Sequence, residues 1–216
     1  PSRRHLQSYE AVETTTLVVN PLAPNPSGRR IMFIVPSMAT DGAARLNLDL
    51  MEGFTGKGHD ITVCATLPTD DGWEYECSLI TPDIFVLPNF LNASDYPRFL
   101  AYLIQSRQID TVVVTGSTIG YQLLPYLRAV SHGVLFVDIC HVEAPHELNG
   151  SHPRFGVGYQ DALDLTIATN KHLGAWLQGC GADGRRLRVM YPGVRSMQSA
   201  RLAEVRHRVR AELSIP

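Results

Sequence analysis

Short runs of apolar, β-branched residues alternate along this chain with segments in which apolar residues recur every three or four positions. The short runs are typical of buried strands, and the recurring spacing is typical of amphipathic helices. The alternation is regular from Ile31 onward. It predicts seven strands, at residues 31–35, 61–65, 84–87, 111–115, 134–137, 165–168 and 187–190.

The pattern predicts four helices between these strands, each with one apolar stripe that can pack against a core. Gly181 is placed to end the last of the four. The predicted stripes are Ala43, Leu46, Leu50 and Phe54, then Phe99, Leu100, Leu103 and Ile104, then Ile119, Leu123, Tyr126, Leu127 and Val130, and finally Leu173, Trp176, Leu177 and Cys180.

The order of these elements predicts the fold class. Strands that are apolar on both faces and joined by crossover helices form a parallel sheet covered by helices on both sides. We therefore predict an α/β fold: a Rossmann-like, doubly wound, mostly parallel sheet of about seven strands flanked by helices. Ligands of such sheets bind beyond the carboxyl ends of the strands, which directs attention to residues 36–42, 115–120, 138–150 and 169–171.

Composition and charge exclude several classes of partner. The chain has 216 residues, a formal net charge of −2 and four cysteines with no C-x-x-C pair. This charge gives no electrostatic basis for binding nucleic acid or an anionic membrane. No apolar run reaches the roughly 20 residues of a spanning helix, so we expect membrane contact to be peripheral at most. We interpret the cysteines as core thiols and, with no secretory signal, expect a cytoplasmic protein.

The first loop runs from the first predicted strand into a helix that opens with the small residues Gly42 and Ala43. Small residues let a ligand approach the backbone, and free amides at a helix start favour a phosphate or another anion. Arg45 would add positive charge. A tight turn with a closely packed helix start explains the same residues equally well. A dinucleotide site is disfavoured because the loop lacks G-x-G-x-x-G, and the Walker pattern of nucleoside triphosphatases is absent.

The densest polar cluster follows the fifth predicted strand, where residues 138–147 contain two histidines and three carboxylates. His141 and Glu143 stand beyond the carboxyl end of the strand, where a polar side chain can face a cleft and bind a ligand hydroxyl. A solvated loop is the alternative, above all for His146 and Glu147. The H-x-E spacing is weak evidence for a metal, so we predict no metal site.

Two further polar residues follow predicted strands. Ser117 lies in the loop after the fourth strand, and Asn170 lies in the loop after the sixth. Either side chain can cap the next helix or contact a ligand in the cleft. Both are candidates for the ligand site.

These segments together resemble the N-terminal domain of the retaining glycosyltransferases of family 4, which have the two-domain GT-B fold. The resemblance covers about residues 30–215. It rests on the turn Gly42-Ala-Ala-Arg45, residues 58–63, the strand that ends in His141, Asp164-Leu-Thr-Ile-Ala-Thr-Asn170 and residues 179–194. The sequence departs from the family pattern at Asp41, Asn170 and Arg195, where glycine, serine and aspartate are usual.

The resemblance implies a hexosyltransferase that moves a sugar from a nucleotide-sugar to a glycan, lipid-linked or protein-linked acceptor, with retention and without a metal or another cofactor. In this interpretation His141 is the catalytic residue, and the cleft is lined by Gly42, Ala43, Arg45, Ser117, Glu143 and Asn170. This half would shape the acceptor side.

The same resemblance implies a domain organisation. Residues 1–29 would form an arm or linker, residues 30–200 the acceptor-side domain, and residues 201–216 the start of a helix leading to a C-terminal domain. That domain would bind most of the nucleotide-sugar through paired glutamates that this sequence lacks. We therefore expect the chain alone to be inactive. The alternative, which the departures at Asp41 and Arg195 favour, is a non-catalytic binding or assembly module.

Overall fold

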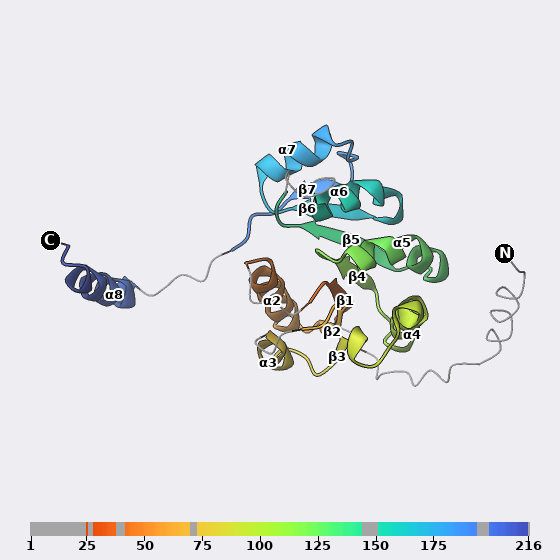
Figure 1. Ribbon diagram of the computed structural model, residues 1–216, viewed down its shortest axis with the longest axis horizontal. Helices are drawn as coiled ribbons and strands as arrows, with labels where there is room; N and C mark the ends of the chain where they lie inside the picture. Colours follow the sequence, from red (N-terminus) through yellow and green to blue (C-terminus); the bar gives the residue numbers. More distant parts are fainter. Residues whose placement is uncertain are drawn as a thin grey trace, which may run out of the picture.

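A seven-stranded sheet forms the centre of the molecule. The computed structural model describes residues 25, 28–37, 42–69, 73–143, 151–193 and 199–215. Within them all neighbouring strands are parallel, which confirms the predicted α/β architecture (Figure 1). The strands are β1 (Arg30–Val35), β2 (Asp60–Ala65), β3 (Ile84–Val86), β4 (Thr111–Val114), β5 (Leu135–Cys140), β6 (Leu165–Ala168) and β7 (Leu187–Val189).

The strand order is β3-β2-β1-β4-β5-β6-β7, so β1 pairs with both β2 and β4. The chain first builds outward from β1 through β2 to β3. It then returns to the other side of β1 and builds outward again from β4 to β7. The connections after β1 and β4 therefore leave in opposite directions, and this switch point is where sheets of this class bind ligands.

Helices connect the strands and cover both faces of the sheet. They are α2 (Gly42–Thr55), α3 (Trp73–Ser78), α4 (Tyr96–Ser106), α5 (Thr118–Val130), α6 (Ser151–Gly158), α7 (Lys171–Gly179) and α8 (Ser199–Glu212), with the 3-10 turns η2 (Leu87–Asn89), η3 (Ala93–Asp95) and η5 (Gln160–Ala162). No helix among the described residues is long and apolar enough to cross a bilayer. That α8 begins a second domain stays a prediction.

Two buried layers hold the helices to the sheet. On one face, α2 and α3 pack on the odd-numbered side chains of β1, including Phe33 and Val35. On the other face, α4 and α5 pack on Met32 and Ile34, and Figure 1 shows these two helix pairs on opposite sides of β1 and β2. Farther along the sheet, Leu173 of α7 packs against the last strands. Alternation of side chains along each strand divides the apolar residues between these layers.

The predicted helix stripes are correct for α4 and α7 at their central positions but wrong for much of α5. In α5 the buried residues include Tyr121, Leu124 and Leu127, whereas Tyr126 and Val130 are exposed. The reason is steric. Gly120 lets the helix approach Ile34, because a Cβ at this position would lie 2.9 Å from the Ile34 Cγ2 atom. The face that carries the glycine therefore packs on the sheet.

In α2 the buried stripe is also rotated from the predicted one. Leu46 is buried as expected, but the residues that accompany it are Ala44, Asn47, Leu48 and Met51. Ala43, Leu50 and Phe54 are half-buried at the margins of this face.

Candidate functional site

The predicted ligand-site residues that the structure describes lie near the carboxyl ends of β1, β4, β5 and β6. Thr115 directly follows β4, His141 directly follows β5, and Thr169 directly follows β6. Because these neighbouring strands are parallel, the three residues meet at one edge of the sheet. The predicted position of His141, just beyond a strand, is confirmed.

His141 is held by the residues that follow the two neighbouring strands. Its Nε2 atom lies 2.7 Å from Thr115 Oγ1, and its carbonyl oxygen accepts a 2.8 Å hydrogen bond from Thr169 Oγ1. Both threonines are buried, and His141 is half-buried. Sequence reasoning missed the two threonines. No local signal identified them, because which strands lie beside β5 is known only from the strand order of the sheet.

Glu143 lies beside a histidine that the sequence did not single out. Its Oε1 atom is 2.8 Å from Nε2 of His172, which stands in the first turn of α7. The Glu143 side chain is 18% exposed and that of His172 is 78% exposed. A hydrogen bond to its own backbone, together with His172, lowers the pKa of Glu143. Glu143 is therefore an anionic hydrogen-bond acceptor close to His141.

Ser117 and Asn170 both cap helices, as the sequence allowed. Ser117 Oγ accepts a 2.9 Å hydrogen bond from the backbone N–H of Gly120 at the start of α5, and it lies 2.7 Å from Thr66 Oγ1. Asn170 Oδ1 accepts a 2.8 Å hydrogen bond from the N–H of Leu173. Ser117 is fully buried, so contact with a ligand would require it to leave these partners. The ligand contacts proposed for both residues stay predictions.

The first loop is described only at its two ends, because residues 38–41 lie outside the described part. Gly42 opens α2, is exposed, and has no atom of the described residues within 4 Å of the position where a Cβ would stand. Ala43 is half-buried. The described residues therefore leave the Gly42 side of the helix start uncovered, which is compatible with close approach of a ligand.

Arg45 is engaged by two carboxylates. Its guanidinium lies 3.0 Å from Asp49 Oδ1 on the same helix and 3.2 Å from Glu76 Oε2 of α3. The hydrogen bond to Asp49 is the largest cause of the raised pKa of Arg45. Its positive charge is thus partly balanced within the domain, and a role toward an anionic ligand stays a prediction.

The predicted loop at residues 138–150 was placed too early. Asp138 belongs to β5 and is fully buried, and its carboxylate accepts hydrogen bonds from the Tyr121 hydroxyl at 2.6 Å and the Cys140 thiol at 3.1 Å. Gly156 of α6 packs so closely that a Cβ there would collide with Asp138 Oδ2. Burial raises the pKa of Asp138 to about 6 and those of Tyr121 and Cys140 well above their usual ranges.

These groups therefore belong to the core behind the site. His146 and Glu147, the other polar residues of the predicted cluster, lie outside the described residues, as do Asp41 and Arg195.

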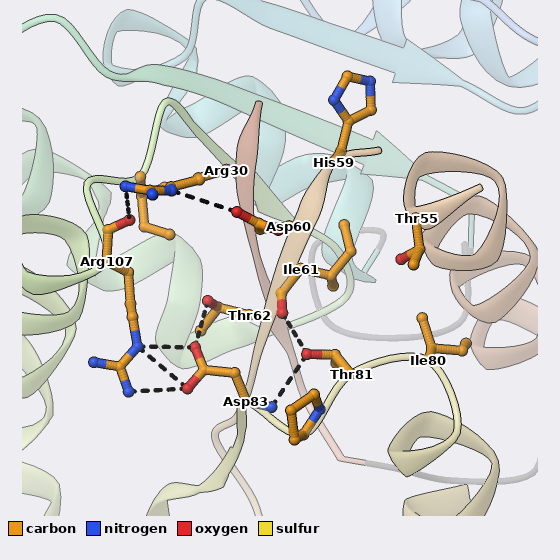
Figure 2. Close-up of a pocket in the computed structure, with 12 residues that line it drawn as sticks. Arg30, Thr55, His59, Asp60, Ile61, Thr62, Ile80, Thr81, Asp83 and Arg107 are labelled. Atoms are coloured by element: carbon orange, nitrogen blue, oxygen red, sulfur yellow. Dashed lines mark hydrogen bonds and ion pairs between the residues drawn. The ribbon is translucent and has the colours of Figure 1, made fainter. Parts of the chain in front are cut away.

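A hollow of about 330 Å³ lies at the opposite edge of the sheet, around the residues that begin β1 and β2 (Figure 2). Its polar groups bind one another. Arg107 contacts both carboxylate oxygens of Asp83 at 2.9 to 3.2 Å, and Thr62 donates a 2.7 Å hydrogen bond to the same carboxylate. This arrangement ties the end of α4 to the start of β3, and it lies at the amino ends of the strands, away from the ligand edge.

Across the described part of the chain, no three side chains of His, Cys, Asp or Glu gather closely enough to hold a metal ion. Residues 38–41 and 144–150 are adjacent to the candidate site in the sequence and are outside that part. A reaction without metal or cofactor stays a prediction.

Comparison with protein families decides the wider assignment. Residues 40–196 match the sequence model of the family described as Glycosyltransferase Family 4. This chain belongs to Glycosyltransferase Family 4. The resemblance noted in the sequence, to the N-terminal domain of a family 4 glycosyltransferase, is confirmed. A comparison with curated protein sequences finds no match.

Solved structures of low sequence identity share the fold of this family 4 chain. The lipopolysaccharide outer core galactosyltransferase WaaB is 14% identical with a TM-score of 0.59, over 79% of this chain and 47% of its own. HepE of Anabaena, solved with UDP and glucose, is 13% identical with a TM-score of 0.57, over 84% and 50%. A glycosyltransferase from Rickettsia africae ESF-5 is 12% identical with a TM-score of 0.59, over 87% and 50%. This chain therefore spans about half the length of these structures.

Proposed function

We propose that this chain forms the acceptor side of a glycosyltransferase that moves a hexose from a nucleotide-sugar to a glycan, lipid-linked or protein-linked acceptor with retention of configuration. Membership of Glycosyltransferase Family 4 supports sugar transfer. HepE was solved with UDP and glucose, which supports a nucleotide-sugar as the donor. WaaB is named as a galactosyltransferase, which supports a hexose as the transferred sugar. The observation that carries the acceptor-side proposal is His141, fixed at the carboxyl edge of the sheet two residues before Glu143.

His141 and Glu143 suit the recognition of a sugar. An imidazole can donate or accept a hydrogen bond, and a carboxylate accepts hydrogen bonds from hydroxyls. In the proposed site His141 binds a hydroxyl of the transferred sugar, and Glu143 binds a hydroxyl nearby. Breaking the donor bond builds negative charge on the leaving phosphate, and preorganised donors stabilise that charge.

The start of α2 is proposed to meet that phosphate. The unpaired N–H groups and the positive end of the helix dipole favour an anion at this position. Gly42 has no side chain to block this approach, and none of the described residues lies within 4 Å of the position of its Cβ. The Arg45 guanidinium would contact the phosphate after breaking its ion pairs with Asp49 and Glu76. Both ion pairs are partly exposed to solvent.

The donor is proposed to bind mainly to a C-terminal domain that this chain does not contain. The chain spans about half of its structural neighbours, which supports a second half for the site. Calorimetry of the 216-residue chain with a panel of nucleotide-sugars tests this. We expect cooperative thermal unfolding but no binding tighter than about 1 mM, because one wall of the site gives few contacts. A micromolar Kd, or sugar transfer by this chain alone, would contradict the proposal.

A non-catalytic assembly module is the second candidate. It is favoured by the internal partners of Arg45 and Ser117, which leave both side chains engaged within the domain. The sequence beyond residue 216 in a longer protein separates the two proposals. A second Rossmann-like domain with paired glutamates supports the enzyme, and a protein without one supports the module.

We infer a cytoplasmic location from the thiols. Cys64, Cys77 and Cys140 are buried and unbridged, and burial raises the pKa of Cys77 to about 11. Unbridged thiols are typical of reducing compartments. Fractionation of cells that make the protein tests this inference, and recovery in a secreted fraction would contradict it.

A further inference from the structure

We propose that Thr115 positions the His141 imidazole for sugar transfer. This inference rests on the proposed function, because it gives Thr115 a role only through a histidine that acts in the site. Thr115 Oγ1 lies 2.7 Å from His141 Nε2, within the range of a direct hydrogen bond. The two residues follow neighbouring strands, β4 and β5, and lie 26 positions apart in the chain.

Thr115 is a rigid partner. It is 1% exposed, and its backbone N–H donates a 3.1 Å hydrogen bond to the carbonyl oxygen of Ile34 in β1. A β-branched side chain in such a backbone has few rotamers. Gly116 then turns the chain with a φ of +66°, and a Cβ at Gly116 would already contact the Pro36 ring at 3.7 Å. The hydroxyl of Thr115 is therefore fixed by the centre of the sheet.

The His141 backbone is fixed from the opposite side. Thr169 Oγ1 donates to the His141 carbonyl oxygen, which ties this residue to the end of β6. With the backbone held, the ring can rotate only about its two side-chain torsions. The Thr115 contact at Nε2 selects one orientation of the ring.

The contact can form with either neutral tautomer of the ring, because a hydroxyl both donates and accepts. If the Thr115 hydroxyl donates to Nε2, the neutral imidazole carries its proton on Nδ1. If Nε2–H donates to Thr115, the neutral ring presents Nδ1 as an acceptor. In either case the hydrogen bond at Nε2 holds the ring in one orientation. A hydroxyl of a sugar then meets an imidazole of defined orientation, which is what a positioning residue provides.

The first test is the ¹⁵N NMR spectrum of the imidazoles in the 216-residue chain, assigned with His141→Ala. We expect Thr115→Val to shift the His141 Nε2 resonance, because Nε2 loses the hydroxyl as its hydrogen-bond partner. Thr115→Ser, which keeps the hydroxyl, should restore it. Thr111→Val is the matched control, since Thr111 begins the same strand at its other end. An unchanged Nε2 resonance in a folded Thr115→Val chain overturns the proposal. If Thr115→Val does not fold, Thr115→Ala replaces it with the same expectation.

The second test is a double-mutant cycle on sugar transfer, in a protein that joins this domain to its donor-binding domain. Thr115→Val should lower kcat about 10-fold with KM nearly unchanged, because the lost contact acts in the transition state. It should have no further effect on a His141→Ala background. An equal loss on both backgrounds overturns the positioning role.

The two hypotheses fail differently. If the joined wild-type protein transfers no sugar, the proposed function fails, and if His141→Ala leaves transfer intact, the role of His141 in it fails, whatever the NMR result. If His141→Ala abolishes transfer but Thr115→Val changes neither the Nε2 resonance nor kcat, only the role of Thr115 fails.

Discussion

At the scale of single residues, the candidate site consists of side chains placed by strand ends and then fixed by contacts between strands. The position of His141 beyond the carboxyl end of a strand could be predicted because the polar cluster follows an apolar run in a parallel sheet. Thr115, Thr169 and His172 could not, since each contacts a partner 26 to 29 positions away. Such contacts depend on strand order, which no local pattern contains.

Gly42 provides a residue-scale test of ligand approach at the start of α2. Gly42→Val should leave the free energy of unfolding within about 1 kcal/mol of the wild type, because the added side chain meets no atom of the described residues within 4 Å. Its bulk should lower kcat/KM for transfer at least about 10-fold if a phosphate approaches this backbone. Gly53→Val is the matched control, because Gly53 lies in the same helix with equally open space. Equal kinetics for both variants would leave the first loop only a structural role.

At the scale of elements, β5 shows where pattern reasoning fails. Asp138 stands at the end of an apolar run, so the pattern predicts a strand that stops at residue 137. In the fold, Tyr121 and Cys140 donate hydrogen bonds to the buried carboxylate, and β5 continues to Cys140. In α5, likewise, the apolar period alone did not identify Gly120 and Tyr121 as the face toward the sheet. Both misplacements arise because tertiary hydrogen bonds and close packing override local preference.

Asp138 provides a test of this packing through the pH dependence of stability. Its pKa of about 6 in the fold exceeds the ordinary value of 3.8, so the folded chain keeps a proton that the unfolded chain releases. The bound proton therefore stabilises the folded chain, fully below about pH 4. This contribution to the free energy of unfolding is lost as the pH rises through 6, and the total loss is up to about 3 kcal/mol. We expect the free energy of unfolding of Asp138→Asn to rise relative to that of the wild type as the pH increases from about 4.5 to about 7.5. Urea unfolding at a series of pH values measures this difference.

The exposed Asp161 provides the control, since Asp161→Asn removes one carboxylate without touching the buried cluster. A difference between Asp138→Asn and the wild type that stays constant with pH would show that the buried carboxyl does not titrate as described.

At the scale of the whole molecule, the fold could be predicted well and the site only in outline. Strands apolar on both faces, with helices between them, leave few topologies other than a doubly wound parallel sheet. The sequence thus predicted which residues follow the carboxyl ends of the strands, the edge where sheets of this class bind ligands. The sequence could not show that Ser117 is buried at the start of α5 or that Arg45 contacts Glu76. Both contacts depend on how the helices pack on the sheet.

The central claim is that the carboxyl edge of this sheet takes part in sugar transfer through His141. The most direct measurement is transfer by a protein that joins this domain to its donor-binding domain, with His141→Ala compared to His132→Ala. His132 is exposed in the turn between α5 and β5, at the opposite edge. The account predicts that His141→Ala lowers kcat/KM at least about 100-fold while the free energy of unfolding changes by about 1 kcal/mol, and that His132→Ala changes neither. Wild-type transfer by a folded His141→Ala protein would contradict it.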